Sequence, residues 1–165
     1  MSIKNVSYKS QVTTVETISS GVPAAAGSAD ITHSGYDTSA TLTPTSTPAA
    51  DTVAYEQFAL SAGAATIDLT SLVGPGGAAV TLNGKKVRLI RFSNPSTNAN
   101  SITVAKGAAN GYTGLGSSFS VTVPPGGDVT FYDGGGGVAV DATHKTLDLT
   151  GTGSQVLNVS VVGGP

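Results

Sequence analysis

Residues that disfavour helices interrupt every segment of this chain that is long enough to form an α-helix. The 165 residues include 22 Gly and 8 Pro, the two residues least favourable inside a helix. Between these breaks, apolar and polar residues alternate with a period of two, as in β-strands. The most apolar segment, Lys86–Phe92, is interpreted as a central strand. The sequence therefore predicts an all-β protein, an antiparallel β-sandwich or jelly-roll-like domain with an extended N-terminal arm and under about a tenth helix.

The alternating segments also predict the core and one of the turns. Asn83-Gly84 follows Val80–Leu82 and precedes the Lys86–Phe92 segment. Asn and Gly both tolerate positive φ, so this pair predicts a type I′ hairpin. One face of each strand in a sandwich is buried against the opposite sheet. The side chains expected in the core are Val87, Leu89, Ile90, Phe92, Ile102, Val104, Phe119, Val121, Phe131, Leu149, Leu157 and Val159.

The first 50 residues differ in composition from the rest. Residues 21–48 are rich in Ala, Ser, Thr and Pro and contain few large side chains. We therefore divide the chain into an N-terminal arm with the first strand or strands, residues 1–50, and a β-sandwich domain, residues 51–165. The arm is read either as a linker, as an ordinary first strand of the sandwich, or as a strand that binds a neighbouring subunit. Its apolar interface candidates are Val6, Tyr8, Val12, Val15 and Ile18.

Charge excludes some classes of partner. With 8 Lys and Arg against 10 Asp and Glu, the net charge is −2, and the basic patch that nucleic-acid binding needs is missing. No apolar run approaches the roughly 20 residues of a membrane-spanning helix, and the N-terminal sequence lacks the apolar region of a signal peptide. Charged residues make up only 11% of the chain, against about 25% in ordinary domains. This favours a surface partly covered by neighbouring molecules.

Catalytic and metal-binding patterns are weak. The chain has no Cys, and its two histidines, His33 and His144, lie outside any recognisable nucleophile motif. Asp128, Asp133 and Asp141 are the best calcium candidates, but they lack the spacing of a calcium loop and are read as turn formers beside glycine. The glycine run that follows Asp133 is not continued by the Lys-Ser/Thr of a phosphate-binding loop. We expect a non-enzymatic protein without a cofactor or small-molecule substrate, and a hydrolase with paired carboxylates is the weaker alternative.

Three further residues are candidates for an interface. Arg88 and Arg91 lie on opposite faces of the central strand by parity. In one reading, the aliphatic part of each side chain lies across the sheet and the guanidinium group stays in solvent. In the other, the guanidinium group forms an ion pair across a subunit boundary. Tyr112, in a Gly-rich loop, is the best aromatic candidate for stacking on a sugar. It supports the alternative function, a carbohydrate-binding or adhesin-type module of a phage fibre or a cell surface.

The segment from Lys86 to Gly163 resembles a family of small β-sandwich proteins encoded in the structural-gene cassettes of tailed phages and prophages. The ordered series of motifs that carries this resemblance comprises residues 87–94 (VRLIRFSN), 102–104 (ITV), 108–114 (AANGYTG), 123–127 (VPPGG), 146–154 (TLDLTGTGS) and 156–163. It covers about half of the chain, and the N-terminal half departs from the compact core of the family.

The resemblance implies a virion component without catalytic residues. Family members look like capsid decoration (cement) proteins, head fibres or tail-associated proteins. A decoration protein is expected to form homotrimers at local threefold positions and to bind the major capsid protein, with an arm that suits exchange between subunits. The implied location is the capsid surface, after synthesis in the host cytoplasm without a signal peptide.

Overall fold

The computed structural model describes residues 3–18, 29–35 and 37–165, which form two compact units. One unit is Val6–Thr41, and the other contains Leu42–Pro165 together with the residues before Val6. Within the described residues, the only helical element is a 3-10 turn, η1 (Pro75–Gly77), and no helix there is long and apolar enough to cross a membrane. The prediction of an all-β protein with antiparallel sheets is confirmed.

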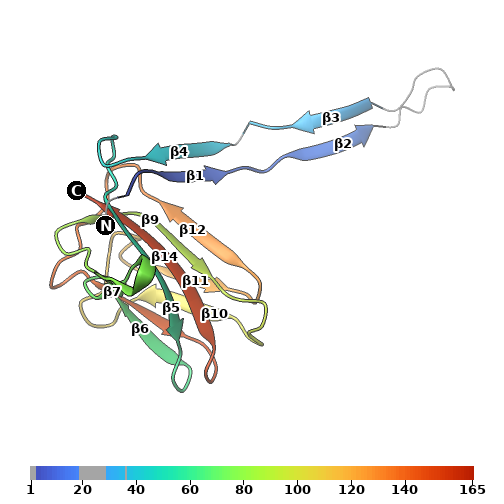
Figure 1. The fold of residues 1–165 in the computed structure, drawn as a ribbon. Coiled ribbons are helices and arrows are strands. Elements are labelled where there is room, and N and C mark those ends of the chain that lie inside the picture. Colours follow the sequence, from blue (N-terminus) through green and yellow to red (C-terminus); the bar gives the residue numbers. More distant parts are fainter. Residues whose placement is uncertain (1–2, 19–28, 36) are drawn as a thin grey trace. The chain divides into compact units, whose positions relative to one another are not determined.

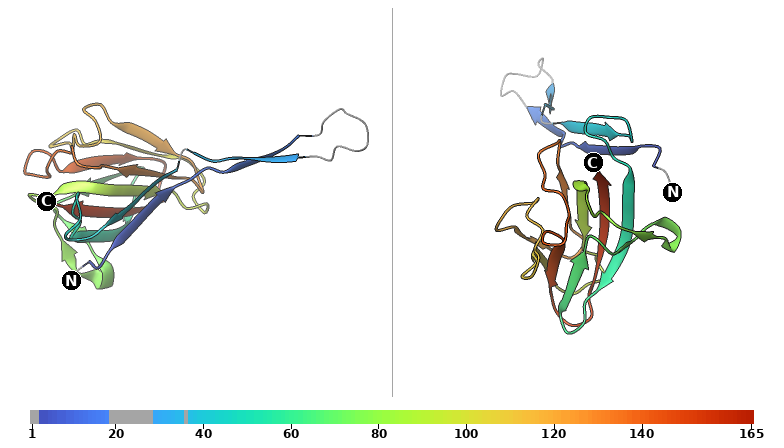
Figure 2. Two further views of the ribbon diagram at one scale, coloured as in Figure 1. Left: turned by 90° about the horizontal axis from the view of Figure 1, so that it is seen from above. Right: turned by 90° about the vertical axis from the view of Figure 1, so that its left-hand side faces the viewer.

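Two four-stranded antiparallel sheets pack against each other in the larger unit (Figures 1 and 2). The first sheet has the order β12 (Asp128–Tyr132), β9 (Lys86–Ser93), β14 (Val156–Gly164) and β5 (Thr52–Ala59). The second has the order β11 (Ser120–Val123), β10 (Ile102–Lys106), β13 (Thr146–Thr150) and β6 (Ala64–Asp68). A small pair, β7 (Leu72–Val73) and β8 (Ala79–Val80), flanks η1. Neighbouring strands are mostly distant in sequence, so the sandwich is held by long-range pairing.

The core lies between the two sheets and contains most of the predicted side chains. Those buried to 3% exposure or less are Val87, Ile90, Phe92, Ile102, Val104, Leu149, Leu157 and Val159. Leu89, Phe119, Val121 and Phe131 are only partly buried. Leu89 lies opposite Val162 on the outer face of its sheet, whereas Phe119, Val121 and Phe131 pack at the margin of the core.

A cluster of three phenylalanines joins that margin to the centre of the core. The ring centroids of Phe119 and Phe131 are 5.2 Å apart with their planes at 82°. Phe92 lies 6.3 Å from Phe131 and 6.4 Å from Phe119. The two contacts of Phe131 are edge-to-face, an arrangement that adds stabilisation beyond the burial of apolar area. Phe92, in a central strand, thus anchors the two rings nearer the edge.

The Asn83-Gly84 turn forms, but the predicted hairpin does not. Lys85 N donates to Leu82 O at 2.8 Å, which closes a tight turn, and Gly84 supplies its positive φ of 77°. Asn83 does not share the positive φ that type I′ requires. The strand before the turn, β8, pairs with β7, and β9 pairs with β12 and β14. Tertiary pairing with β14 therefore decides the neighbours of β9, and the local turn does not.

The boundary between the units lies at Leu42, earlier than the expected position 51. Leu42 and Ala50 are both buried, and Ala50 N donates to Thr43 O at 2.9 Å. Asp51 N then bonds to Gly163 O at 3.0 Å, which ties this segment to the end of β14. Residues 43–50 therefore belong to the sandwich unit, although their composition resembles that of the arm.

The smaller unit is a ribbon made of two successive pairs of strands. The strands are β1 (Val6–Ser10), β2 (Thr14–Ile18), β3 (Ala29–His33) and β4 (Thr38–Leu42). β1 pairs with β4 and β2 with β3, and none of them joins either four-stranded sheet. The interpretation of the N-terminal segment as an ordinary first strand of the sandwich is therefore wrong. We call the smaller unit, Val6–Thr41, the arm.

Replacement of Phe92 by Ala should lower the free energy of unfolding by about 3–5 kcal/mol, because the ring is fully buried and its removal leaves a cavity. Urea denaturation measures the loss. Tyr55→Ala, on a side chain that is 56% exposed, is the matched control and should change stability by less than about 1 kcal/mol. Equal effects of the two changes would mean that the inner face of this sheet has been misassigned.

Candidate functional site

Arg88 lies at an irregularity in the pairing of β9 with β14. Val162 is opposite Leu89, but the next residue, Gly163, is opposite Val87. Arg88 is thus the extra residue of a β-bulge, a feature that redirects side chains. Its side chain is turned inward, and the residue is only 5% exposed. The expectation that Arg88 presents its charge at an interface is therefore not met by this structure.

The buried guanidinium has few partners. Its Nη2 donates to the carbonyl oxygen of Pro165, and its Nη1 lies 3.7 Å from Oδ2 of Asp133. Nε and Nη1 find no hydrogen-bond acceptor among the described residues. Since a buried charge is costly unless it is paired, the Asp133 carboxylate is the described side chain that compensates the charge of Arg88.

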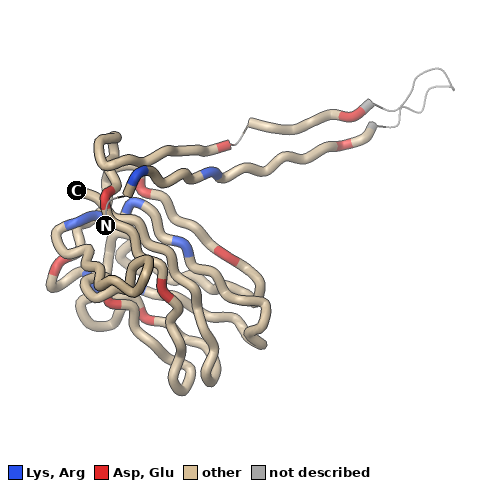
Figure 3. Tube along the Cα trace, in the orientation of Figure 1, with Lys and Arg blue, Asp and Glu red and all other residues tan. Residues whose placement is uncertain are grey.

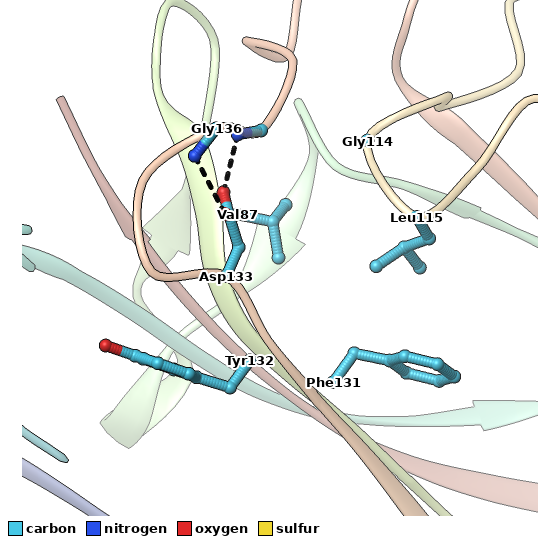
Figure 4. Close-up of a pocket in the computed structure, with 8 residues that line it drawn as sticks. Val87, Gly114, Leu115, Phe131, Tyr132, Asp133 and Gly136 are labelled. Carbon is cyan, nitrogen blue, oxygen red and sulfur yellow. Dashed lines mark hydrogen bonds between the residues drawn. The ribbon is translucent and has the colours of Figure 1, made fainter.

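The glycine run after Asp133 wraps around this carboxylate (Figure 4). Oδ1 accepts from the N–H groups of Gly135 at 2.9 Å and Gly136 at 3.0 Å, and Oδ2 accepts from Gly137 at 2.7 Å. A Cβ on Gly137 would lie 2.3 Å from Oδ2, so any side chain there would displace the carboxylate from this loop. Partial burial acts to raise the pKa of Asp133, but these three donors and Arg88 outweigh it and lower the pKa below its usual value.

Tyr112 is buried beside this pair and does not form an exposed platform. It is 1% exposed, and its hydroxyl donates to the carbonyl oxygen of Val138 at 2.9 Å. Burial raises the pKa of the phenol. The expected contact of Tyr112 with a partner or a sugar is therefore contradicted, because its ring belongs to the core.

A cavity of about 270 Å³ opens next to the Asp133 loop. Its lining combines the apolar side chains of Val87, Leu115 and Phe131 with Tyr132, Asp133 and three glycines (Figure 4). The Asp133 carboxylate already accepts three backbone hydrogen bonds. This carboxylate is therefore already engaged within its own loop.

Arg91 points to the opposite face of the same sheet, as parity predicts. Its side chain is 50% exposed, and its Nε lies 3.1 Å from Oδ2 of Asp128 on β12. Both partners are accessible to solvent, where an ion pair contributes about 0–1 kcal/mol. Arg91 thus has a partner within its own sheet and remains open to a second contact.

The two histidines are accessible and make local contacts. His33 Nε2 lies 3.4 Å from Oε2 of Glu16 across the arm. His144 Nδ1 lies 3.1 Å from Asp141 Oδ1 and 3.0 Å from the Thr143 hydroxyl. Because both neighbours contact the same ring nitrogen, this group cannot pass a proton through the imidazole as a catalytic triad does.

The acidic residues considered for calcium are not brought together. Asp128 pairs with Arg91, Asp133 is held by its glycine loop, and the Asp141 carboxylate accepts from the backbone N–H of Thr143 at 2.6 Å. Across the described residues, no group of three His, Cys, Asp or Glu side chains could hold a metal ion. Each aspartate instead closes a turn or pairs with one neighbouring side chain.

The arm exposes apolar side chains. Val12 is 74% exposed, Val15 is 58% exposed and Ile31 is 41% exposed. Val6 and Tyr8 are partly buried, and the side chain of Ile18 lies outside what the structure describes. The predicted interface residues of the arm thus lie on β1, on β2 and between these two strands.

Comparison with known proteins finds no family model that matches the chain and no curated protein with a matching sequence. Function is therefore inferred from the contacts of its own residues. The pairing of Arg88 with Asp133 was not anticipated from the sequence. The signal was an Asp followed directly by four glycines, a pattern that supplies several unhindered N–H groups to a carboxylate.

Asp133→Asn should cost about 1–3 kcal/mol at pH 7, because it leaves Arg88 buried without a charge partner and places an amide N–H₂ against glycine donors. Arg88→Met should cost less than about 1 kcal/mol, since it removes the unsatisfied guanidinium and leaves the Asp133 carboxylate its three backbone donors. Denaturant unfolding measures both effects.

The cost of Asp133→Asn should also depend on pH. A carboxyl group whose pKa is lowered by folding stabilises the protein above its unfolded pKa of about 3.9, and this contribution is lost as pH falls further. The difference between the wild type and Asp133→Asn should therefore shrink below about pH 4. A larger cost for Arg88→Met than for Asp133→Asn would contradict this account of the pair.

Proposed function

We propose that this chain is a non-enzymatic structural protein of a virion, a capsid decoration protein that binds the outer shell and stabilises it through protein–protein contacts. The observation that carries the proposal is the arm. It is a two-stranded ribbon whose apolar side chains at Val12, Val15 and Ile31 are exposed. The partners and the location on the capsid come from the resemblance to virion proteins of tailed phages.

An isolated ribbon of two strands is at best marginally stable in water. Fixing each residue of its backbone costs roughly 1–2 kcal/mol, and a ribbon has no enclosed core to offset this cost. Contact with a partner surface supplies the missing burial, and a strand added to a sheet edge also supplies main-chain hydrogen bonds. An arm of this kind is therefore suited to assembly.

The sandwich unit supports the same proposal through its charges. Lys85 pairs with Asp51 at 2.6 Å and Lys145 with Asp68 at 2.8 Å, in addition to the pairs made by Arg88 and Arg91. A domain that pairs its charges internally has little net field with which to attract an ionic ligand. The sandwich unit therefore suits a rigid body that covers a capsid shell. In the proposed role, it forms a homotrimer that binds the major capsid protein.

The proposal is tested with virions purified from the source culture and stripped of this protein. The full chain should rebind and co-sediment with the particles. A variant that begins at Leu42 should bind more than about tenfold more weakly, while its sandwich still unfolds cooperatively because the arm contributes no strand to either sheet.

Two results would contradict the proposal. One is the absence of the protein from purified virions together with failure of the full chain to bind them. The other is equal binding by the full chain and the truncated variant. Specific binding of glycans by the truncated sandwich would instead support the carbohydrate-binding alternative.

A further inference from the structure

The distal half of the arm, β2 with β3, presents the same chemistry on both of its faces. Directly opposed residues of an antiparallel pair share a face, and consecutive residues of a strand alternate between faces. The central pairs of this register are Val15–Thr32, Glu16–Ile31 and Thr17–Asp30. Val15 and Asp30 therefore lie on one face, and Ile31 and Glu16 lie on the other. Each face thus combines a branched apolar side chain with a carboxylate.

Both of these apolar side chains are open to solvent. The exposed fraction is 58% for Val15 and 41% for Ile31. Docking of the arm through a single face would leave one of the two uncovered. Docking through a strand edge would leave both uncovered, because side chains project from the faces of a sheet and main-chain groups from its edges. Burial of both side chains requires a partner that covers the two faces at once.

The charges of the distal half are all of one sign (Figure 3). No Lys or Arg occurs between Lys9 and Lys85, so that β2 and β3 carry two carboxylates and a formal net charge of −2 with histidine neutral. Glu16 and Asp30 are exposed, and the side chain of Glu16 is 64% exposed although its Oε2 lies 3.4 Å from His33 Nε2. Repulsion between like charges disfavours nucleic acid and anionic lipid as partners, whereas Lys and Arg on a protein surface are favoured.

We propose that the distal half of the arm inserts into a two-walled groove of a shell protein, each wall of which presents an apolar surface beside a Lys or Arg. Both walls carry this chemistry because both faces of the arm carry its complement. A junction between two copies of one shell protein related by a twofold axis provides such a pair of walls, since each copy contributes the same surface.

Insertion between two walls also offsets the weakness of the ribbon. Two strands without a core are marginally stable in water, and the walls supply the apolar layer that each face lacks. The inference rests on the proposed role of the arm in assembly. It adds the way in which the arm is bound and the chemistry of the surface that receives it.

Thiol protection tests the two-sided contact, because the natural chain has no Cys. The full-length variants Val15→Cys and Ile31→Cys each place one thiol on one face of the arm. Each variant is treated with a neutral alkylating reagent, free and bound to stripped virions, and the labelling of this chain is followed by mass spectrometry. Binding should slow the labelling of both thiols more than about tenfold, because a covered thiol is inaccessible to the reagent. Virions that still carry the native protein are the control and should leave both rates unchanged.

Charge reversal tests the basic groups on the walls. Glu16→Lys and Asp30→Lys should each weaken the binding of the full chain to stripped virions about tenfold at low salt, and less at high salt, where charges are screened. Asp37→Lys makes the same charge change outside the distal half and is the matched control. It should weaken binding less than about twofold. If a Cys variant binds too weakly to be labelled, the charge variants decide between the outcomes.

Three results would overturn the inference while leaving the assembly role in place. Protection of one thiol only would mean that the arm docks through one face, and protection of neither would mean that it docks through an edge. Unchanged or tighter binding by both Glu16→Lys and Asp30→Lys would mean that the walls are not basic. Failure of the full chain to bind stripped virions is a different result, which removes the assembly role and this inference together.

Discussion

The sandwich depends on the insertion of β14 between β5 and β9. β14 pairs antiparallel with β5 from Val156 to Gly163 and with β9 from Asn158 to Gly164. It is also the last strand in the chain, and its contacts are far apart in sequence, with Gln57 and Asn158 separated by 101 positions. Without β14, β5 would have no neighbour in its sheet. Because such long-range pairings must overcome the entropy of closing large loops, the first sheet is completed only when β14 docks between β5 and β9.

The end of β14 also explains why a charged residue is tolerated in the core. The irregular pairing at Val162 and Gly163 turns Arg88 inward, and Pro165 then provides an acceptor for it. The carbonyl oxygen of Arg88 in turn accepts from Asp133 N at 2.9 Å, so the glycine loop is positioned by the same residue. One bulge thus ties together the central strand, the chain end and the loop after β12. Removal of any one residue of this set should therefore affect all three elements, whereas removal of a single surface contact should not.

The sequence indicated the fold class well because alternation of apolar residues reports directly on which face of a strand is buried. Ile90 and Phe92 share one face by this alternation, and Val87 was placed in the core because it lies in the same, most apolar segment; all three are buried. The failures arose where tertiary contacts override local patterns. Asn83-Gly84 makes a turn without a hairpin because β9 pairs elsewhere. Tyr112 lies in a Gly-rich loop typical of a surface, yet its loop folds inward and its hydroxyl reaches Val138. The role of Arg88 depends on partners that are distant in sequence, Asp133 and Pro165, and these could not be deduced from its own strand.

The distribution of charge over the strand edges gives the arm a property that the sandwich lacks. The edge strands β5, β6 and β12 carry Glu56, Asp68 and Asp128, and none of the four sandwich edges, β11 included, has a Lys or Arg. Charged side chains on edges discourage strands from adding to them, and edges of one sign discourage pairing between copies most. The arm differs, because Lys9 on β1 and Glu16 on β2 place both signs of charge on its strands. The edges of the sandwich therefore oppose association between copies more strongly than the strands of the arm do.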